Sequence, residues 1–369
     1  MTTTESVIAD RALQAGEAAP WFRGRTLGGH PNFEFSTVGG HHVMLMFMAS
    51  AGNAEGQGAL RAMLANRDLF DDRNAMIFGV TRDPDDEAKG RIAHILPGIR
   101  WFLDYDGAIA RQFGVLQEAG DRPFWLLLDP QLRVVARAGA EAGDRILAVL
   151  RARTALPRED GHAPVLIVPR IFEPEFCRYL IEVYDRAGGQ PSGFMRDVGG
   201  KTVGMLDDKM KRRSDHFIND EAVRAEIRIR LARRLVPMMQ RAFSFNATRI
   251  ERYMVACYGS EGAGGYFRAH RDNVSAGTAH RRFACTINLN EEEYEGGDLT
   301  FPEYGVRRYR APTGGAVIFA CGMLHEAQPV TRGKRYACLP FFYDEAAARQ
   351  REAIVKSGKV NEDLASYRA

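Results

Sequence analysis

Three side chains in the second half of the chain have the types and spacing of a metal site. His270 and Asp272 form a His-x-Asp pair in GYFRAHRDN, and His325 follows the apolar run GGAVIFACGML. Side chains at positions i and i+2 of a strand emerge on one face, so His270 and Asp272 are expected to share an ion. Two imidazoles and one carboxylate suit non-haem Fe(II) and leave coordination positions open. On spacing alone, an ordinary surface pair is an equally good interpretation.

Several basic residues lie near these candidates. Arg335 follows His325 by ten residues, and its guanidinium can hold a carboxylate through two parallel hydrogen bonds. Taken alone, it would be read as a surface residue. The charged run from Lys209 to Arg213 is expected to be solvated surface. Arg281 and Arg282, near the expected substrate entrance, are also read as solvated, with contact to an acidic peptide as the alternative.

The surrounding pattern must position these side chains. From Thr248 to Tyr343, short apolar runs alternate with Gly and Pro turns, which predicts a double-stranded β-helix, or jelly roll. Helices are expected on its flank at residues 173–188 and 219–243.

The first half has a different rhythm. Strand-like and helix-like segments alternate there, which predicts an α/β layer. Strands are expected at 41–50, 75–83, 123–130 and 132–139, and a strand running into a helix at 100–115. Helices are expected at 54–70, 86–96 and 144–154.

The chain is therefore predicted to have two domains. The segment at residues 154–163 interrupts the pattern with Pro, Gly and charge. We place a first domain at residues 1–155, a second at 162–345, and a C-terminal helical tail at 346–369.

Composition limits the class of protein. The 369 residues are 45% hydrophobic and 26% charged, as in soluble globular proteins. The net charge of +3 gives no case for nucleic acid, and no apolar stretch is long enough to cross a membrane. The start of the chain shows no signal-peptide pattern, and the five cysteines have no CxxC spacing. We expect reduced thiols and a cytoplasmic location.

Three longer motifs carry a family resemblance. MVACYGSEGAGGYFRAHRDN, CTINLNEEEYEGGDLTFPE and HEAQPVTRGKRYACLPFF resemble the core motifs of prolyl 4-hydroxylase-like 2-oxoglutarate oxygenases, over about residues 162–345. The resemblance implies His270, Asp272 and His325 as iron ligands and Arg335 as the partner of the 2-oxoglutarate 5-carboxylate. Tyr258 matches a tyrosine that lines the cosubstrate pocket.

The resemblance also implies an activity. Asn288 falls where relatives often have a Tyr or Thr that helps bind the same carboxylate. Fe(II), 2-oxoglutarate and O₂ are the implied cofactor and cosubstrates, with ascorbate as a reductant. The implied reaction couples decarboxylation of 2-oxoglutarate to hydroxylation of a peptidyl proline or related residue. Asp272 favours hydroxylation, because related halogenases lack this carboxylate.

Other functions stay open at this point. The second domain could be a sensor that binds Fe(II) and 2-oxoglutarate without turnover, and the substrate could be a protein, a peptide or a small molecule. Fold resemblance alone does not decide between them.

The first half resembles the AhpC/TSA peroxiredoxin branch of the thioredoxin fold. The resemblance rests on GEAAPWF, VMLMFMASAGNAEGQGALRAM, FLDYDGAIARQFGV and DRPFWLLLDPQLRVV, and it implies Arg122 as the active-site arginine and Pro123 as a cis-proline. Cys177 is the first cysteine of the chain, so this domain has no thiol to form a peroxidatic thiolate. We expect a redox-inactive docking or assembly domain rather than a thiol peroxidase, and we leave a homodimer open.

Overall fold

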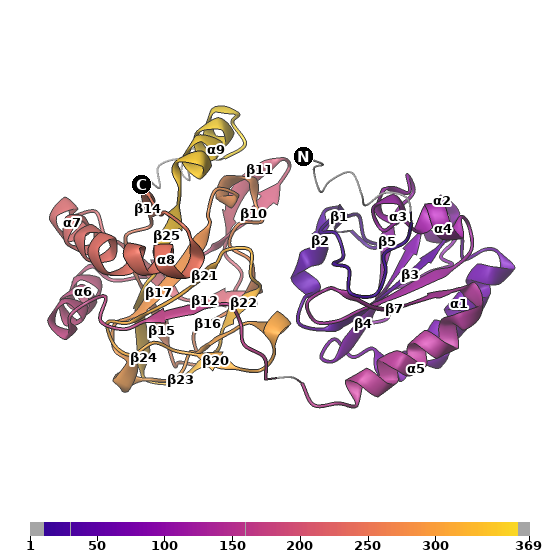
Figure 1. Ribbon diagram of the computed structural model, residues 1–369, viewed down its shortest axis with the longest axis horizontal. Helices are drawn as coiled ribbons and strands as arrows, with labels where there is room; N and C mark the ends of the chain where they lie inside the picture. Colours follow the sequence, from indigo (N-terminus) through magenta and orange to yellow (C-terminus); the bar gives the residue numbers. More distant parts are fainter. Residues whose placement is uncertain (1–10, 30, 159, 361–369) are drawn as a thin grey trace. The chain divides into compact units, whose positions relative to one another are not determined.

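The computed structural model describes residues 11–29, 31–158 and 160–360. The chain divides into two compact units, Met1–Asp160 with Pro302–Gly305, and Gly161–Phe301 with Val306–Ala369 (Figure 1). We call them the first and the second domain.

A five-stranded sheet forms the centre of the first domain. Its order is β5-β4-β3-β6-β7. Strands β3, β4 and β5 pair in parallel, β6 pairs antiparallel with β3, and β7 pairs antiparallel with β6. The strands are β3 (His42–Met48), β4 (Ala75–Thr81), β5 (Ile99–Leu103), β6 (Phe124–Leu128) and β7 (Val134–Gly139). A short pair, β1 (Arg23–Gly24) with β2 (Phe33–Glu34), precedes them.

Strand β3 shows why both faces of this sheet are covered. Val43, Leu45 and Phe47 pack into one buried cluster, whereas the methionines that alternate with them pack into another. A strand that is apolar on both faces has to lie between two layers. The helices of this domain are α1 (Ala54–Ala65), α2 (Pro84–Ala88), α3 (Ala108–Gln112), α4 (Val115–Ala119) and α5 (Gly143–Thr154).

The expected helix at 86–96 is wrong in its length. Helix α2 ends at Ala88, and Gly90 follows with a φ of 62°. A left-handed residue ends a helix and favours glycine, so the chain turns there. Residues 91–94 have no helical or strand assignment.

A buried carboxylate fixes the loop after β3. Asp86 is fully buried and accepts hydrogen bonds from the Ala51 amide at 2.8 Å and the Thr81 hydroxyl at 2.5 Å. Its other oxygen lies 3.3 Å from Arg91. The loop is therefore closed by a network of hydrogen bonds.

Two sheets form the second domain. The larger has the order β14-β25-β17-β24-β15-β13-β9, with β21 paired to β17 and β8 to β21. The smaller has the order β12-β16-β22-β19-β20. Strands of the larger sheet are β8 (Leu166–Val168), β9 (Gln190–Pro191), β13 (Ser214–Phe217), β14 (Arg249–Glu251), β15 (Met254–Gly259), β17 (Phe283–Asn288), β21 (Ala316–Ala320), β24 (Lys334–Cys338) and β25 (Phe341–Tyr343).

The smaller sheet carries two of the three candidate ligands. Its strands are β12 (Lys211–Arg212), β16 (Tyr266–His270), β19 (Leu299–Thr300), β20 (Arg308–Tyr309) and β22 (His325–Ala327). Two further pairs stand apart, the hairpin β10 (Phe194–Val198) with β11 (Lys201–Met205), and β18 (Glu295–Gly296) with β23 (Val330–Arg332).

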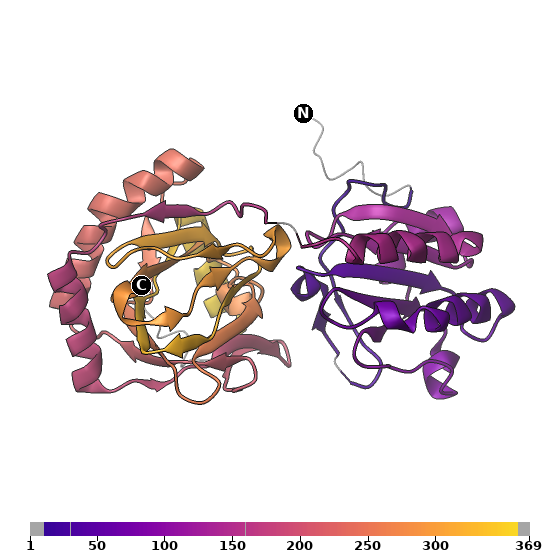
Figure 2. The same ribbon diagram turned by 90° about the horizontal axis from the view of Figure 1, so that it is seen from below.

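Helices cover one side of this domain (Figures 1 and 2). Leu180 of α6 (Pro174–Ala187), Ile227 of α7 (Glu221–Arg230) and Met239 of α8 (Val236–Phe243) share a buried cluster with Ile287 and Ile318 of the larger sheet. The apolar sides of these helices therefore belong to the core of the second domain. The C-terminal helix is α9 (Glu345–Lys356), and residues 361–369 of the expected tail lie outside the described residues.

The expected helix at 219–243 contains one irregular turn. Residues Leu231–Leu235 form a π-helical turn between α7 and α8. Pro237 has no amide hydrogen to continue the α-helical ladder, and a widened turn absorbs the mismatch.

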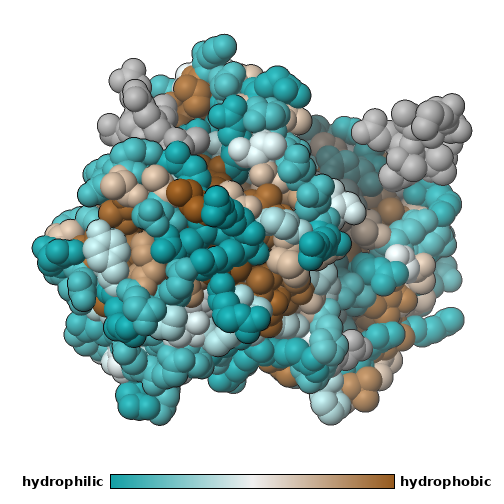
Figure 3. All heavy atoms as spheres, turned by 60° about the vertical axis from the view of Figure 1, so that its left-hand side comes forward, coloured by the Kyte–Doolittle hydropathy of each residue, from teal (hydrophilic) through white to brown (hydrophobic). Residues whose placement is uncertain are grey.

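The surface gives two further facts. In the part of the chain that the structure describes, every helix is too short or too polar to cross a bilayer. Hydrophilic side chains prevail on the face in Figure 3, with hydrophobic ones in small groups.

We expect Asp86→Ala to destabilise the first domain by roughly 3 kcal/mol, because it removes a buried acceptor and an ion-pair partner. Trp21, Trp101 and Trp125 are the three tryptophans of the chain and all lie in this domain. Urea unfolding followed by tryptophan fluorescence therefore reports on this domain alone.

The neighbouring Asp85 provides the matched control. Its side chain is 50% exposed and pairs with Lys89 one helical turn away, so Asp85→Ala should change stability by only about 0.5 kcal/mol. Equal losses in the two variants would contradict a special role for Asp86.

Candidate functional site

The register between two strands brings the candidate ligands together. His270 ends β16 and His325 begins β22, and these residues face each other in the antiparallel pair. The ligand atoms of His270, Asp272 and His325 all lie within 4.8 Å of one another. The Nε2 atoms of His270 and His325 are 3.6 and 3.4 Å from the Asp272 carboxylate.

Asp272 reaches the cluster by another route than strand alternation. Strand β16 ends at His270, and Asp272 lies in the turn that follows. Its amide donates a hydrogen bond to the carbonyl of Cys321 at 3.0 Å, which ties this turn to the segment before β22. The predicted convergence is present, although its predicted cause is wrong for Asp272.

The two histidine rings are oriented for metal binding. His270 Nδ1 lies 2.7 Å from the carbonyl of Arg268, and His325 Nδ1 lies 3.0 Å from that of Met323. A carbonyl only accepts, so each Nδ1 carries the hydrogen and each Nε2 keeps its lone pair. Those lone pairs point toward a carboxylate. A divalent cation between them would replace repulsion by attraction, so the residues fit a metal.

Burial and mutual contact set the ionisation of the cluster. Burial, together with the nearby His270, lowers the pKa of His325 to about 4. Burial alone would raise the pKa of Asp272, but the two histidines bring it below its ordinary value. At neutral pH His325 is therefore a neutral ligand and Asp272 an anionic one, as a metal requires.

A pocket of about 530 Å³ opens beside the cluster. One part of its wall is apolar and another part is cationic. Asp272 is the one acidic residue among the described residues that line it. The lining residues are Arg213, Arg252, Tyr258, Phe267, His270, Asp272, Ala284, Cys285, Thr286, Leu299, Phe319, His325, Ala327, Arg335, Leu339 and Phe341.

Arg335 is a buried cation in this pocket. It lies on β24 opposite Tyr258 of β15, is 2% exposed, and its guanidinium carbon is 5.0 Å from the centre of the Tyr258 ring. Its Nη2 donates to the Thr286 hydroxyl at 2.9 Å. Among the described residues no carboxylate pairs with Arg335. Because a buried, unpaired cation is costly, this position favours the binding of an anionic ligand.

Asn288 supports Arg335 from outside the cavity. Its side-chain oxygen is 3.4 Å from Nε and from Nη2 of Arg335, and its amide donates to the carbonyl of Ala311 at 2.7 Å. The cavity wall is formed by Thr286, two residues earlier on β17. Sequence reasoning named Asn288 from the family position and missed Thr286, although residues two apart on a strand share a face.

The expectation of solvated surface for the run from Lys209 to Arg213 is wrong for Lys211 and Arg213, whereas Lys209 is exposed. Lys211 is 5% exposed, and the Arg213 side chain is 4% exposed and lines the pocket. Arg213 forms an ion pair with Asp215 at 2.6 Å and donates to the Tyr258 hydroxyl at 3.2 Å. Because strand residues alternate, Arg213 and Asp215 share a face, and this i, i+2 pair of opposite charges was the available signal.

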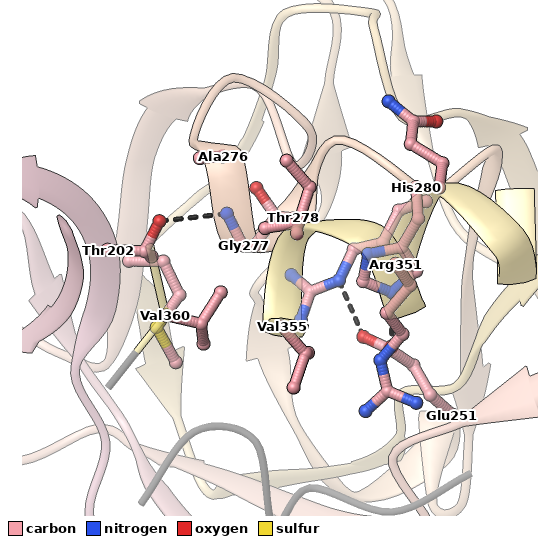
Figure 4. A pocket seen from close by; sticks show the side chains of 13 residues that line it. Thr202, Glu251, Ala276, Gly277, Thr278, His280, Arg351, Val355 and Val360 are labelled. Carbon is pink, nitrogen blue, oxygen red and sulfur yellow. Dashed lines mark hydrogen bonds and ion pairs between the residues drawn. The ribbon is translucent and has the colours of Figure 1, made fainter. Parts of the chain in front are cut away.

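Arg281 is likewise not solvated. It is 9% exposed and donates to the buried carboxylate of Glu251 at 2.6 Å. His280 contacts the same carboxylate at 2.6 Å. These residues line a second cavity of about 500 Å³, on which α9 contributes Arg351 and Val355 (Figure 4). Arg282 is half-buried and bonds to the Ala279 carbonyl and Gln350.

The loop that follows β3 in the first domain holds no cysteine. The described cysteines, all free, belong to the second domain. Arg122 is half-exposed and pairs with Glu141 at 3.1 Å. The expectation of a cis bond at Pro123 is wrong, since the cis peptide bond among the described residues is Leu96-Pro97.

Comparisons with known proteins agree with this division. A family model described as the 2OG-Fe(II) oxygenase superfamily matches residues 253–343, and a model of the AhpC/TSA family matches residues 15–139. The expected two domains, one thioredoxin-like and one oxygenase-like, are confirmed at this level.

Curated relatives match the oxygenase segment. A PKHD-type hydroxylase of Polaromonas sp. is 39% identical over 112 residues, which cover 28% of this chain and 45% of that protein. PKHD-type hydroxylase PiuC of Pseudomonas aeruginosa is 35% identical over 95 residues, covering 24% and 41%. The chain thus spans less than half the length of these relatives.

Solved structures are similar at low identity. A Pseudomonas putida prolyl-4-hydroxylase is 18% identical, with a TM-score of 0.36 and coverage of 49% of this chain and 93% of that one. A prolyl hydroxylase from Trichoplax adhaerens is 16% identical, with a TM-score of 0.37 and coverage of 52% and 86%. Two family models thus match separate parts of this chain, that of the 2OG-Fe(II) oxygenase superfamily at residues 253–343 and that of the AhpC/TSA family at residues 15–139.

Proposed function

We propose that the second domain is an Fe(II)- and 2-oxoglutarate-dependent dioxygenase that hydroxylates a peptidyl proline or a related residue. The observation that carries this proposal is the presence, in one pocket, of three converging ligand atoms and a buried arginine without a carboxylate partner. The names of the PKHD-type relatives support the same reaction class. We also propose that the two sheets of this domain are the layers of a double-stranded β-helix.

Each group of the pocket has a separate task in this proposal. His270, Asp272 and His325 would hold Fe(II), and Arg335 with Thr286 and Tyr258 would bind the distal carboxylate of 2-oxoglutarate. When bound, Fe(II) and 2-oxoglutarate supply the activation of O₂ that oxidises a C–H bond. The chain itself orients both imidazoles through their Nδ1 hydrogens and surrounds the site with apolar side chains that exclude water.

Two secondary assignments follow from the same reading. Ascorbate would serve as a reductant. The five free thiols support a reducing compartment, and we propose the cytoplasm.

The metal assignment predicts that His270→Ala, Asp272→Ala and His325→Ala each abolish 2-oxoglutarate turnover and weaken metal binding, because a three-ligand site has no spare ligand. Succinate formation and calorimetric titration with Mn(II) measure the two effects. His162→Ala is the control, since His162 is an exposed histidine of the same domain. Normal turnover in a ligand variant would remove that residue from the site.

Arg335→Ala should raise the 2-oxoglutarate KM at least tenfold while metal binding is kept, because losing one partner of a buried charge pair costs roughly 2 to 5 kcal/mol. The matched control is Arg332→Ala, whose side chain is 67% exposed and pairs with Glu295. An unchanged KM in Arg335→Ala would leave Arg213 as the candidate for this carboxylate.

We propose that the first domain docks a substrate or assembles subunits, because it has no thiol for redox chemistry. A protein of residues 160–369 should keep 2-oxoglutarate turnover but lose either dimerisation or efficient hydroxylation of a macromolecular substrate, because a short linker gives a docked partner a high effective concentration. Light scattering and kcat/KM on one substrate compare the two lengths. Agreement in both would refute this role, and peroxide turnover by the first domain would revive the peroxidase.

Substrate turnover separates an oxygenase from a sensor. The protein is incubated with Fe(II), 2-oxoglutarate and a lysate of its source, and peptides that gain one oxygen atom are sought by mass spectrometry. Succinate formed in proportion to such a product supports the oxygenase. Binding of 2-oxoglutarate without product supports the sensor.

A further inference from the structure

A third arginine in the metal pocket, besides Arg213 and Arg335, has no role in the proposed reaction. Arg252 lies in the turn between β14 and β15, and its guanidinium lines the same pocket as the three ligands and Arg335. The side chain is 17% exposed and packs between the rings of Phe217 and Phe341, with its guanidinium carbon 6.0 and 5.3 Å from their centres.

The carboxylates near Arg252 are engaged by other cations. Asp215 pairs with Arg213 through both carboxylate oxygens, at 2.6 and 2.7 Å. Glu251 accepts from Arg281 and contacts His280, each at 2.6 Å. Asp215 Oδ2 is 3.8 Å from Arg252, which is too long for a hydrogen bond. Arg252 is therefore the surplus cation of this cluster.

Keeping an arginine at this position is costly to the fold. Burial, with Arg281 and Arg213 nearby, lowers the pKa of Arg252 to about 10, so its charge is poorly compensated. Its φ is 69°, in the left-handed region that favours glycine or asparagine. Strain of this kind collects at positions that serve a ligand.

Arg252 and Arg335 serve different parts of the pocket. Arg335 faces Tyr258 near the end of β15, whereas Arg252 precedes Met254 at its start. Tyr258 lies four positions after Met254, or roughly 13 Å along the strand. A small dicarboxylate bound at Arg335 and the metal would therefore leave Arg252 free.

The charges of the pocket give an independent argument. Arg213, Arg252 and Arg335 outnumber Asp215 and Asp272 by one. Lys211 is left out of this count because it does not line the pocket, and its ammonium donates to the Ser192 hydroxyl and the Gly193 carbonyl. A divalent metal and the dianion 2-oxoglutarate cancel each other. One negative charge is still needed for a neutral pocket.

We propose that the guanidinium of Arg252 binds a carboxylate of the primary substrate, placing the oxidised C–H bond near an acidic group. This inference rests on the proposed function and narrows its substrate class. The carboxylate can be an Asp or Glu side chain of a peptide or the α-carboxylate of a terminal residue or free acid, which share this chemistry.

Acetate is a probe for this subsite. Saturation-transfer NMR on the acetate methyl group measures binding to protein saturated with Zn(II) and 2-oxoglutarate, which fills the Arg335 end. We expect saturable binding, weakened at least about tenfold by Arg252→Asn and largely kept by Arg252→Lys. Acetamide, which has the same shape without the charge, should not bind.

The variants are chosen so that a folding defect does not imitate the result. Asparagine suits the left-handed backbone, so Arg252→Asn should unfold at the same temperature as the wild type or higher. Arg282→Asn is the control, because Arg282 does not line the pocket, and acetate binding should be unchanged. Absence of saturable binding, or equal binding by Arg252→Asn and the wild type, would overturn the subsite.

The lysate screen then identifies the source of the carboxylate. Oxygenated peptides with Asp or Glu beside the modified residue indicate a side-chain carboxylate, and modified terminal residues or free acids indicate an α-carboxylate. Enrichment of neither would overturn the substrate assignment. If 2-oxoglutarate fails to bind but acetate binding still depends on Arg252, the proposed function fails and the subsite stands.

Discussion

The pairing of β16 with β22 is the constraint on which the site depends. It sets His270 opposite His325, and side chains alternate between the faces of a strand. A slip of one residue would turn His325 to the other face and remove it from the cluster. The hydrogen bond from Asp272 to Cys321 adds the third ligand through the same two segments. The smaller sheet thus determines whether a metal site exists at all.

The larger sheet supplies polar and cationic side chains beside that site. Thr286, Tyr258 and Arg335 come from three of its neighbouring strands, so they are held as rigidly as the core itself. Buried ion pairs add little stability in general, because desolvation offsets their attraction. The pairs Arg213 with Asp215 and Arg281 with Glu251 are better understood as supports that keep a cationic pocket in one arrangement.

The sequence was informative where a pattern is local. The alternation of strands and helices in the first domain, the apolar stripe of α6 to α8, and the convergence of His270, Asp272 and His325 could all be read from it. The π-helical turn before Val236 could not, because Pro237 in a helical pattern predicts either a kink or an end.

Sequence reasoning failed mainly on buried charge. Lys and Arg are usually exposed, so the run at 209–213 was read as surface. Asp215 gave a local sign for Arg213. Arg252 offers no such sign, because its burial depends on Phe341, which is far away in the sequence and adjacent only through the pairing of β14 with β25.

The orientation of the two histidines has a consequence for metal competition. Hydrogen bonds through both Nδ1 atoms fix a ligand set of two nitrogens and one carboxylate before any ion arrives. Such a set binds Co(II), Ni(II) and Cu(II) more tightly than Fe(II), following the ordinary order of stability of divalent ions. Rigid ligands select a coordination geometry, so the identity of the bound metal depends on which ions are available. In a cell, the loaded fraction would follow the ratio of available Fe(II) to these competing ions.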